Sequence, residues 1–340
     1  MDRNDALLSD WRQQALALEA EVAKAVIGQA RVIRLVTTAV FARGHVLLQG
    51  DVGVGKTTLL RAFAQVLGGD FARTEGSIDL MPNDLVYYTH IGHDGRPAVD
   101  PGPLIQHGEG LAIFFFNEIN RARPQVHALL LRAMAERSVT AFNREYRLPH
   151  LLVFADRNRV EREETFEISS AARDRFMMEI TIDPPATEDD RRRLMFEPRF
   201  HDVDRLVGEL TRGMVACHEL NDVAEVVQRS ITASDALQAY TMSLWRATAE
   251  PAAFGVRLPE IDTARLMLAG ASPRGMSMLL RAARVAAWLQ GRSFVTPEDV
   301  QAVFPECIAH RLCYQPVYEM QRHDISGPLT SAILQGVAAP

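Results

Sequence analysis

The chain has 340 residues, of which 47% are hydrophobic and 24% charged, and its formal net charge is −6 at pH 7. This composition is typical of a folded globular protein of about two domains and excludes a largely disordered chain. Proteins that bind nucleic acid usually present a basic surface, and the longest basic run here is residues 191–193. Because Asp189 and Asp190 precede that run, we interpret it as a solvated helix face, with a local basic pore in a ring as the alternative. We do not expect a nucleic-acid partner.

The three cysteines, Cys217, Cys307 and Cys313, show no CxxC spacing. This argues against a disulfide framework and a structural zinc site, and we expect reduced thiols in a cytoplasmic protein. The N-terminus has no apolar stretch behind a basic start and so does not resemble a signal peptide. The longest purely apolar run, residues 111–116, has six residues, whereas a helix needs about 20 to cross a bilayer. We therefore expect no membrane span.

The first half of the chain predicts strands that alternate with helices. Short apolar runs predict buried strands, and apolar residues at helical spacing predict amphipathic helices. This alternation is typical of an α/β fold in which helices cover both faces of a parallel sheet. The predicted strands are residues 45–49, 111–116, 151–155 and 178–182, and the predicted helices are residues 6–25, a second helix through Val40, residues 56–67 and a helix from Pro124.

Beyond Pro184 and Pro185, strand-like runs nearly vanish, and the chain predicts helices only. Two helix starts are marked by a hydroxyl residue followed by proline, at Ser272 and Thr296. We expect an αβα core over residues 1–185, an all-helical lid domain over 186–312 and a C-terminal tail over 313–340. The predicted lid helices are residues 188–195, 203–220, 232–248, 261–268, 273–290 and 297–310.

Residues 50–57 fit the phosphate-loop pattern G-x-x-x-x-G-K-[ST]. Its glycines let backbone N–H groups point toward an anion, and the following helix adds its positive N-terminus. Lys56 is expected to reach the β- and γ-phosphates and Thr57 to bind Mg²⁺. Among 37 basic residues only Lys24 and Lys56 are lysines, so a chance match is improbable. The residues expected to hold ATP are Gly50, Asp51, Val52, Gly53, Val54, Gly55, Lys56, Thr57 and Thr58.

Asn117 and Glu118 follow the apolar run 111–116, and α/β folds build their sites at such strand ends. Glu118 is placed to polarise the water that attacks ATP, although an ordinary surface acid is the alternative. Asn117 stands where a carboxylate is expected near Mg²⁺. Its carbonyl can accept a bond from a magnesium-bound water, but the negative charge is missing. We therefore expect a weakened metal site and slower hydrolysis.

The region around Glu118 resembles the Walker B region of the MoxR family of AAA+ ATPases, a ring-forming group. The resemblance extends in order over residues 25–312. It implies an AAA+ module in which a P-loop αβα core is followed by a helical lid. Residues 79–84 resemble the family's DLLPSD segment, 154–158 its FATQN strand end, 174–176 its DRF, 271–274 its ASPR and 295–300 its VTPEDV.

The resemblance also implies roles for individual residues. Asn158 would be the sensor that bonds the γ-phosphate or the attacking water. Arg175 would be the arginine finger that reaches the nucleotide of a neighbouring subunit, with Arg173 as a competing candidate. Arg274 would sense the γ-phosphate from the lid of the same subunit. A finger that acts between subunits couples hydrolysis to ring assembly, and the resemblance implies a hexamer.

MoxR relatives act as chaperones that mature enzyme complexes, commonly with a partner that bears a von Willebrand factor A domain. The resemblance therefore implies an ATPase that uses ATP and Mg²⁺ to remodel or activate partner proteins. An alternative is an ATP-binding ring scaffold in which Asn117 leaves little or no hydrolysis. A nucleic-acid motor and a small-molecule kinase are weaker alternatives, opposed by the net charge and by the sensor and finger arginines respectively.

Some residues depart from the family pattern or stand outside it. Arg157 and Arg159 flank Asn158 where the family usually has glutamine and proline, and we expect this departure to alter the sensor geometry. His90 and His93, with Asp94 beside them, form only a weak metal signal, and a pore-facing insertion suits that segment better. Tyr87 and Tyr88 are candidates either for gripping a client in a pore or for buried packing.

Overall fold

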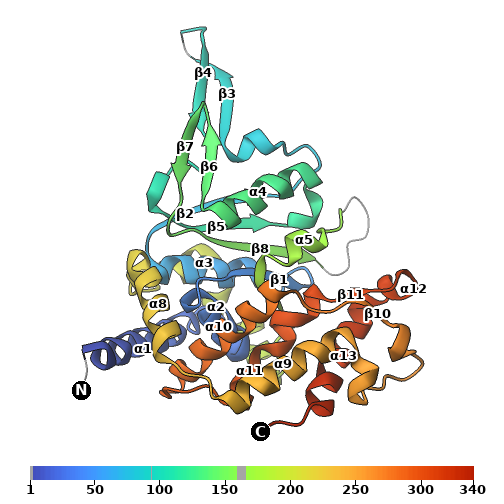
Figure 1. The fold of residues 1–340 in the computed structure, drawn as a ribbon. Helices are drawn as coiled ribbons and strands as arrows, with labels where there is room; N and C mark the ends of the chain where they lie inside the picture. The colour runs from blue at the N-terminus through green and yellow to red at the C-terminus, as the bar shows by residue number, and fades with distance from the viewer. Residues whose placement is uncertain (1–2, 93, 159–165) are drawn as a thin grey trace. The chain divides into compact units, whose positions relative to one another are not determined.

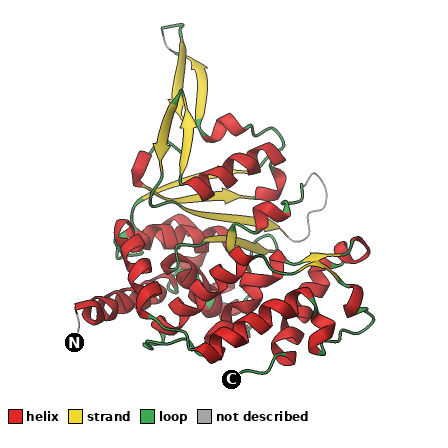
Figure 2. Ribbon diagram, in the orientation of Figure 1, coloured by secondary structure: helices red, strands yellow, loops and turns green. Residues whose placement is uncertain are grey.

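The computed structural model describes residues 3–92, 94–158 and 166–340. The chain divides into two compact units. We call them the sheet unit, Gln13–Arg175 with Ile180–Asn221, and the helical unit, Met1–Arg12 with Phe176–Glu179 and Asp222–Pro340. Figures 1 and 2 show the elements of each.

Within the described residues, five strands form one sheet in the order β2-β5-β8-β1-β9. The pairs β1–β8, β5–β8 and β2–β5 are parallel. All seven residues of β5 are buried, as expected for a strand covered on both faces. In Figure 1, α4 covers one face of these strands and α3 the other. The predicted α/β fold with a parallel sheet is therefore confirmed, and each of the four predicted strands is present.

The sequence prediction missed β2, at one edge of the sheet. This strand reads Asp-Phe-Ala-Arg-Thr-Glu, and only Ala72 and Thr74 are buried. Because an edge strand has one neighbour and a solvated side, it lacks the continuous apolar run that marks β5. The strands are β1 (His45–Gly50), β2 (Asp70–Glu75), β3 (Tyr87–Ile91), β4 (Pro97–Pro101), β5 (Leu111–Asn117), β6 (Ser138–Ala141), β7 (Arg144–Arg147), β8 (Leu152–Asn158), β9 (Phe176–Thr181), β10 (Met267–Ala269) and β11 (Cys313–Tyr314).

Two antiparallel hairpins, β3–β4 and β6–β7, extend away from the sheet in the sheet unit (Figure 1). They touch through Tyr87 and Phe142, whose ring centroids lie 4.8 Å apart. Tyr88, next to Tyr87 on β3, is 47% exposed. Of the two tyrosines considered for a pore or for packing, Tyr87 therefore packs against another ring, and Tyr88 presents its ring to solvent.

Two predicted helices are wrong. The helix predicted over residues 203–220 ends at Gly208, because the following segment forms backbone bonds to α3 instead: Gly213 N–H donates to Gln65 O and Val215 N–H to Val66 O. The helix predicted over residues 261–268 is a 3₁₀ turn followed by β10, in which Met267 pairs with Tyr314 of β11. Both errors arise because contacts distant in sequence overrode local periodicity.

Residues 313–340, expected as a tail, contain β11, α12 and α13, and α13 buries Leu329 and Ile333. No described helix is both long enough and apolar enough to cross a membrane. The α-helices are α1 (Arg3–Val22), α2 (Ala30–Phe41), α3 (Lys56–Leu67), α4 (Pro124–Glu136), α5 (Ser170–Arg173), α6 (Glu188–Phe196), α7 (Val203–Gly208), α8 (Leu220–Ser230), α9 (Asp235–Ala249), α10 (Pro273–Leu289), α11 (Pro297–Ile308), α12 (Pro316–Glu319) and α13 (Arg322–Gly336).

Candidate functional site

The predicted phosphate loop connects β1, which ends at Gly50, to α3, which begins at Lys56. Gly55 precedes the helix with a φ of 90°, a left-handed conformation that favours glycine. Asp51, Val52 and Gly53 are exposed in the loop. The loop therefore combines free access from solvent with the positive N-terminal end of a 12-residue helix, a combination that suits an anion.

Lys56 is buried at the start of α3, and its ammonium group lies among oxygen atoms. Its Nζ donates hydrogen bonds to Gly50 O at 2.8 Å, Asp51 O at 3.0 Å and Asn158 Oδ1 at 2.7 Å. Asp156 Oδ2 lies 3.9 Å from the same nitrogen. A buried charge is tolerated only when it is paired and hydrogen-bonded. The lysine thus joins the phosphate loop to the end of β8.

Glu118 directly follows β5 and has left-handed backbone angles, φ 52° and ψ 51°. Its Oε1 accepts a hydrogen bond from Asn158 Nδ2 at 3.1 Å, and its Oε2 pairs with Arg121 Nη1 at 3.0 Å. Asn158 therefore bridges Lys56 and Glu118, with its oxygen toward the cation and its nitrogen toward the carboxylate. The structure brings together three of the residues that the sequence predicted for the site.

Asp156 belongs to the same cluster, and the sequence prediction assigned it no role. It is 1% exposed, and its Oδ1 accepts a hydrogen bond from the backbone N–H of Glu118 at 2.6 Å. Burial raises the pKa of Asp156 to about 6, although the Glu118 N–H and the Lys56 charge act in the opposite direction. A carboxylate two positions before Asn158 on one strand shares its face of the sheet. That spacing was the signal available in the sequence.

The residues predicted to hold Mg²⁺ are Thr57, in the first turn of α3, and Asn117, buried at the end of β5. Hydroxyl, amide and carboxylate oxygens are the donors Mg²⁺ prefers, and it usually takes only one or two ligands from the protein beside phosphates and waters. The oxygen donors at this sheet edge therefore fit the ion. In the described part of the chain, no group of three or more His, Cys, Asp or Glu residues is arranged to hold a metal.

The weak metal candidate in the β3–β4 hairpin has a different arrangement. His90 Nδ1 lies 3.5 Å from Asp100 Oδ2 on the facing strand. Asp94 hydrogen-bonds the backbone N–H of Arg96 at 3.1 Å, as in a turn. His93 lies outside the described residues. His90 and Asp94 therefore each contact another residue of the hairpin.

The predicted arginine finger, Arg175, follows the short helix α5 in the sheet unit. It is partly exposed, and its Nη1 donates to Ala171 O at 2.9 Å. The competing candidate, Arg173, is 8% exposed. Arg157 donates to Gln49 Oε1 at 2.6 Å, across the β1–β8 pair, and Arg159 lies outside the described residues. Of the two finger candidates, Arg175 is partly exposed and Arg173 is buried.

The lid residue Arg274 lies in the helical unit, exposed in the first turn of α10. The turn is fixed by Ser272, whose Oγ accepts a hydrogen bond from Gly275 N–H at 3.0 Å. The predicted hydroxyl-proline helix start is therefore present.

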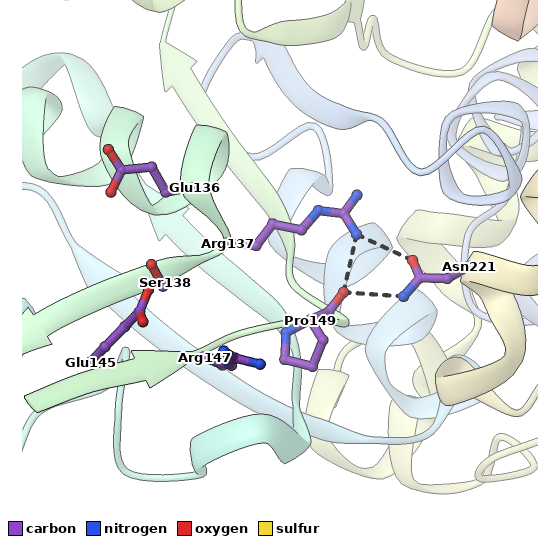
Figure 3. Close-up of a pocket in the computed structure, with 7 residues that line it drawn as sticks. All are labelled: Glu136, Arg137, Ser138, Glu145, Arg147, Pro149 and Asn221. Atoms are coloured by element: carbon purple, nitrogen blue, oxygen red, sulfur yellow. Dashed lines mark hydrogen bonds between the residues drawn. The ribbon is translucent and has the colours of Figure 1, made fainter.

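A hollow of about 450 Å³ lies elsewhere in the sheet unit, at the base of the β6–β7 hairpin (Figure 3). Arg137 Nη1 donates there to Pro149 O at 3.0 Å and to Asn221 Oδ1 at 3.2 Å. Asn221 also donates to Pro149 O, at 3.2 Å. These three residues tie the base of the hairpin to the start of α8. None of the residues predicted to bind nucleotide lines the hollow.

Gly76, just after β2, lies against the backbone of Glu118. Its N–H donates to Asn117 O at 2.7 Å, and a Cβ at this position would collide with the carbonyl oxygen of Glu118. We expect Gly76→Ala to lower the free energy of unfolding by about 1–3 kcal/mol, because the backbone at the end of β5 must move. Urea unfolding measures this effect.

The matched control is Gly208→Ala, because a Cβ at Gly208 meets no atom within 4 Å. The control should be neutral or slightly stabilising. Equal stability of the Gly76 variant and the wild type would contradict the close approach.

Family models and a solved structure both match this chain to ATPases. The family model for the ATPase family associated with various cellular activities (AAA) matches residues 45–178, and the AAA lid domain matches residues 261–328. A crystal structure from Cytophaga hutchinsonii, of a protein provisionally assigned as an ATPase, superposes with a TM-score of 0.82 at 28% identity, covering 98% of this chain and 97% of that one.

Three named relatives match along most of the chain. The chain is 59% identical to Protein MoxR of Methylorubrum extorquens, over 99% of this chain and 98% of that protein. It is 54% identical to Protein MoxR of Paracoccus denitrificans, over 99% of each. It is 32% identical to Chaperone MoxR1 of Mycobacterium tuberculosis, over 94% of this chain and 81% of that protein.

Proposed function

Since this chain belongs to the MoxR family of AAA+ ATPases, we propose that it is a chaperone that uses ATP binding and hydrolysis to remodel, mature or activate partner protein complexes. The observation that carries the proposal is the chain of contacts from Lys56 through Asn158 to Glu118. A relative in Mycobacterium tuberculosis is named as a chaperone, which supports the same role here.

ATP binds at residues 50–58 in this proposal. The loop N–H groups and the N-terminus of α3 hold the phosphate oxygens, and Lys56 supplies the positive charge. Thr57 and Asn117 would hold Mg²⁺, Asn117 through a metal-bound water, and the ion would supply positive charge to the phosphates. Lys56 already donates to three protein oxygens, so a phosphate replaces at least one of these partners. Arg274 is the γ-phosphate sensor in this proposal, as the family resemblance implies.

Glu118 polarises the water that attacks the γ-phosphate. Asn158 fixes the position of Glu118 relative to Lys56. Asn158 contacts Lys56 with one side-chain atom and Glu118 with the other. A phosphate that draws Lys56 toward itself therefore also acts on the partner of Glu118. This arrangement lets the protein couple the presence of the γ-phosphate to the position of the carboxylate.

Subunits assemble into a ring, which we take to be a hexamer, and Arg175 reaches the nucleotide of the neighbour. Its partial exposure, in contrast to the buried Arg173, supports this choice of finger. We further propose that the core spans residues 1–185 and the lid residues 186–312. The protein is proposed to act in the cytoplasm. Its proposed partner carries a von Willebrand factor A domain, and its proposed client is an enzyme complex.

Mixing two inactive variants tests the proposed finger. We expect Arg175→Ala to lower ATP turnover by about 10²-fold, because one preorganised cation is lost from the reaction site. Glu118→Gln should also be inactive. In a ring with head-to-tail contacts, an equimolar mixture should regain about one quarter of wild-type turnover, since that share of sites combines an intact Glu118 with a neighbour's intact Arg175.

The control is the surface variant Arg132→Ala, whose arginine is 63% exposed in its side chain and pairs with Glu136. It should turn over ATP like the wild type. A mixture that stays inactive, although each variant assembles, would contradict a finger acting between subunits.

A ring scaffold with little hydrolysis is the second candidate, favoured by the neutral amide of Asn117 at the end of β5. Turnover of wild type against Asn117→Asp separates the two functions. Measurable wild-type turnover supports the chaperone ATPase, whereas activity only in the variant supports the scaffold.

A further inference from the structure

Two departures from the family pattern lie side by side on neighbouring strands. Phe116 of β5 pairs with Ala155 of β8, so the next residues along, Asn117 and Asp156, are neighbours at the sheet edge. Paired residues of parallel strands project to the same face. The family motif has aspartate where this chain has Asn117, and threonine, in FATQN, where this chain has Asp156. The carboxylate missing from β5 is therefore present one strand away.

The contacts of Asp156 connect it to both key groups of the proposed site. Its Oδ1 accepts the backbone N–H of Glu118 at 2.6 Å, the bond that fixes the left-handed turn after β5. Its Oδ2 lies 3.9 Å from Lys56 Nζ. The second oxygen is therefore beside the phosphate-binding lysine but too far for a direct hydrogen bond with it. A carboxylate that is only 1% exposed is stabilised by cationic neighbours, because a buried charge must be paired.

We propose that Asp156 supplies the carboxylate that Asn117 lacks. It positions Glu118 through Oδ1 and faces the magnesium ion of Mg-ATP through Oδ2. This inference rests on the proposed function, because it concerns the same nucleotide site. It also removes the main argument for a hydrolysis-deficient scaffold, since the negative charge near the metal is relocated rather than lost.

The test measures metal binding at equilibrium, so it does not depend on turnover. Fluorescence of a methylanthraniloyl ATP analogue is followed as Mg²⁺ is titrated, for the wild type and for Asp156→Asn. Asparagine keeps the acceptor for the Glu118 N–H and removes only the charge. We expect the Mg²⁺ midpoint to rise by about tenfold or more, the range typical of lost metal-site partners. Mn²⁺ binding followed by electron paramagnetic resonance provides a second readout.

The exchange variant Asn117→Asp with Asp156→Thr restores the family arrangement. Its Mg²⁺ midpoint should lie within about threefold of the wild type, because the site again holds one carboxylate. The matched control is Glu75→Gln. Glu75 pairs with Asn117 from the opposite neighbouring strand, and its side chain is 64% exposed. This variant should leave the midpoint unchanged.

An unchanged midpoint in Asp156→Asn, with analogue binding intact, would overturn the inference and leave the proposed function standing. Failure of the wild type to bind the analogue at any Mg²⁺ concentration would contradict the proposed function itself and the inference with it. If Asp156→Asn does not fold, as judged by circular dichroism, the exchange variant decides. A midpoint close to the wild type supports the relocation, and one weakened more than tenfold overturns it.

Discussion

Replacing Glu118 with glutamine is expected to lower ATP turnover by a factor on the order of 10²–10⁴, the usual contribution of a general base, while ATP still binds. Glutamine has the same size, and its oxygen can still accept the bond that Asn158 Nδ2 now makes at 3.1 Å. The change therefore removes the negative charge and little of the geometry. Phosphate release measures turnover, and calorimetric titration with ATP measures binding.

The control is Glu136→Gln, at the end of α4. Its side chain is 59% exposed and pairs with Arg132 at 3.6 Å, so its charge contributes little. This variant should hydrolyse ATP like the wild type. If Glu118→Gln retained more than about a tenth of wild-type turnover, well above the level expected on loss of a general base, Glu118 would be an ordinary surface acid and another group would have to activate the water.

The central strands of the fold were predictable because their own residues show that they are buried. Strand β5 is a run of apolar residues closed by Asn117, and all of it is buried. Such a run is typical of a strand covered on both faces. Strand β2 carries no comparable pattern, since Asp70, Arg73 and Glu75 keep partial or full access to solvent at the sheet edge. The residues of β10 likewise became a strand only through pairing with β11, which is distant in the sequence.

The candidate site was predictable as a set of residues but not as a network. The phosphate-loop motif predicted Lys56 and the position after an apolar strand predicted Glu118, because α/β folds build their sites at such strand ends. Asn158 was expected from the family resemblance. The role of Asp156 depends on strand register, which places it beside Asn117, and on its bond to the Glu118 N–H. Neither is encoded in local periodicity. The expectation of a weakened metal site considered Asn117 alone, whereas the carboxylate that we propose to replace it stands on the neighbouring strand.

Replacing Lys56 with alanine is expected to weaken ATP binding by at least about 10²-fold, because removing a buried cation from its anionic partner costs roughly 3–5 kcal/mol. Turnover should fall by about 10²–10³-fold, because the same cation stabilises the charge that develops on the transferring phosphate. The ammonium group is buried and contacts Gly50, Asp51 and Asn158. Calorimetric titration with ATP, with and without Mg²⁺, measures the change. Thermal unfolding shows whether the variant remains folded.

The chain provides its own control, because Lys24 is the other lysine among 37 basic residues. Lys24 is 63% exposed in its side chain and pairs with Glu21, so Lys24→Ala should bind ATP like the wild type. Lys56→Arg should not restore binding, because a planar fork cannot take the place of a compact ammonium group among three oxygens. Binding restored by arginine would therefore contradict the proposed role of the lysine.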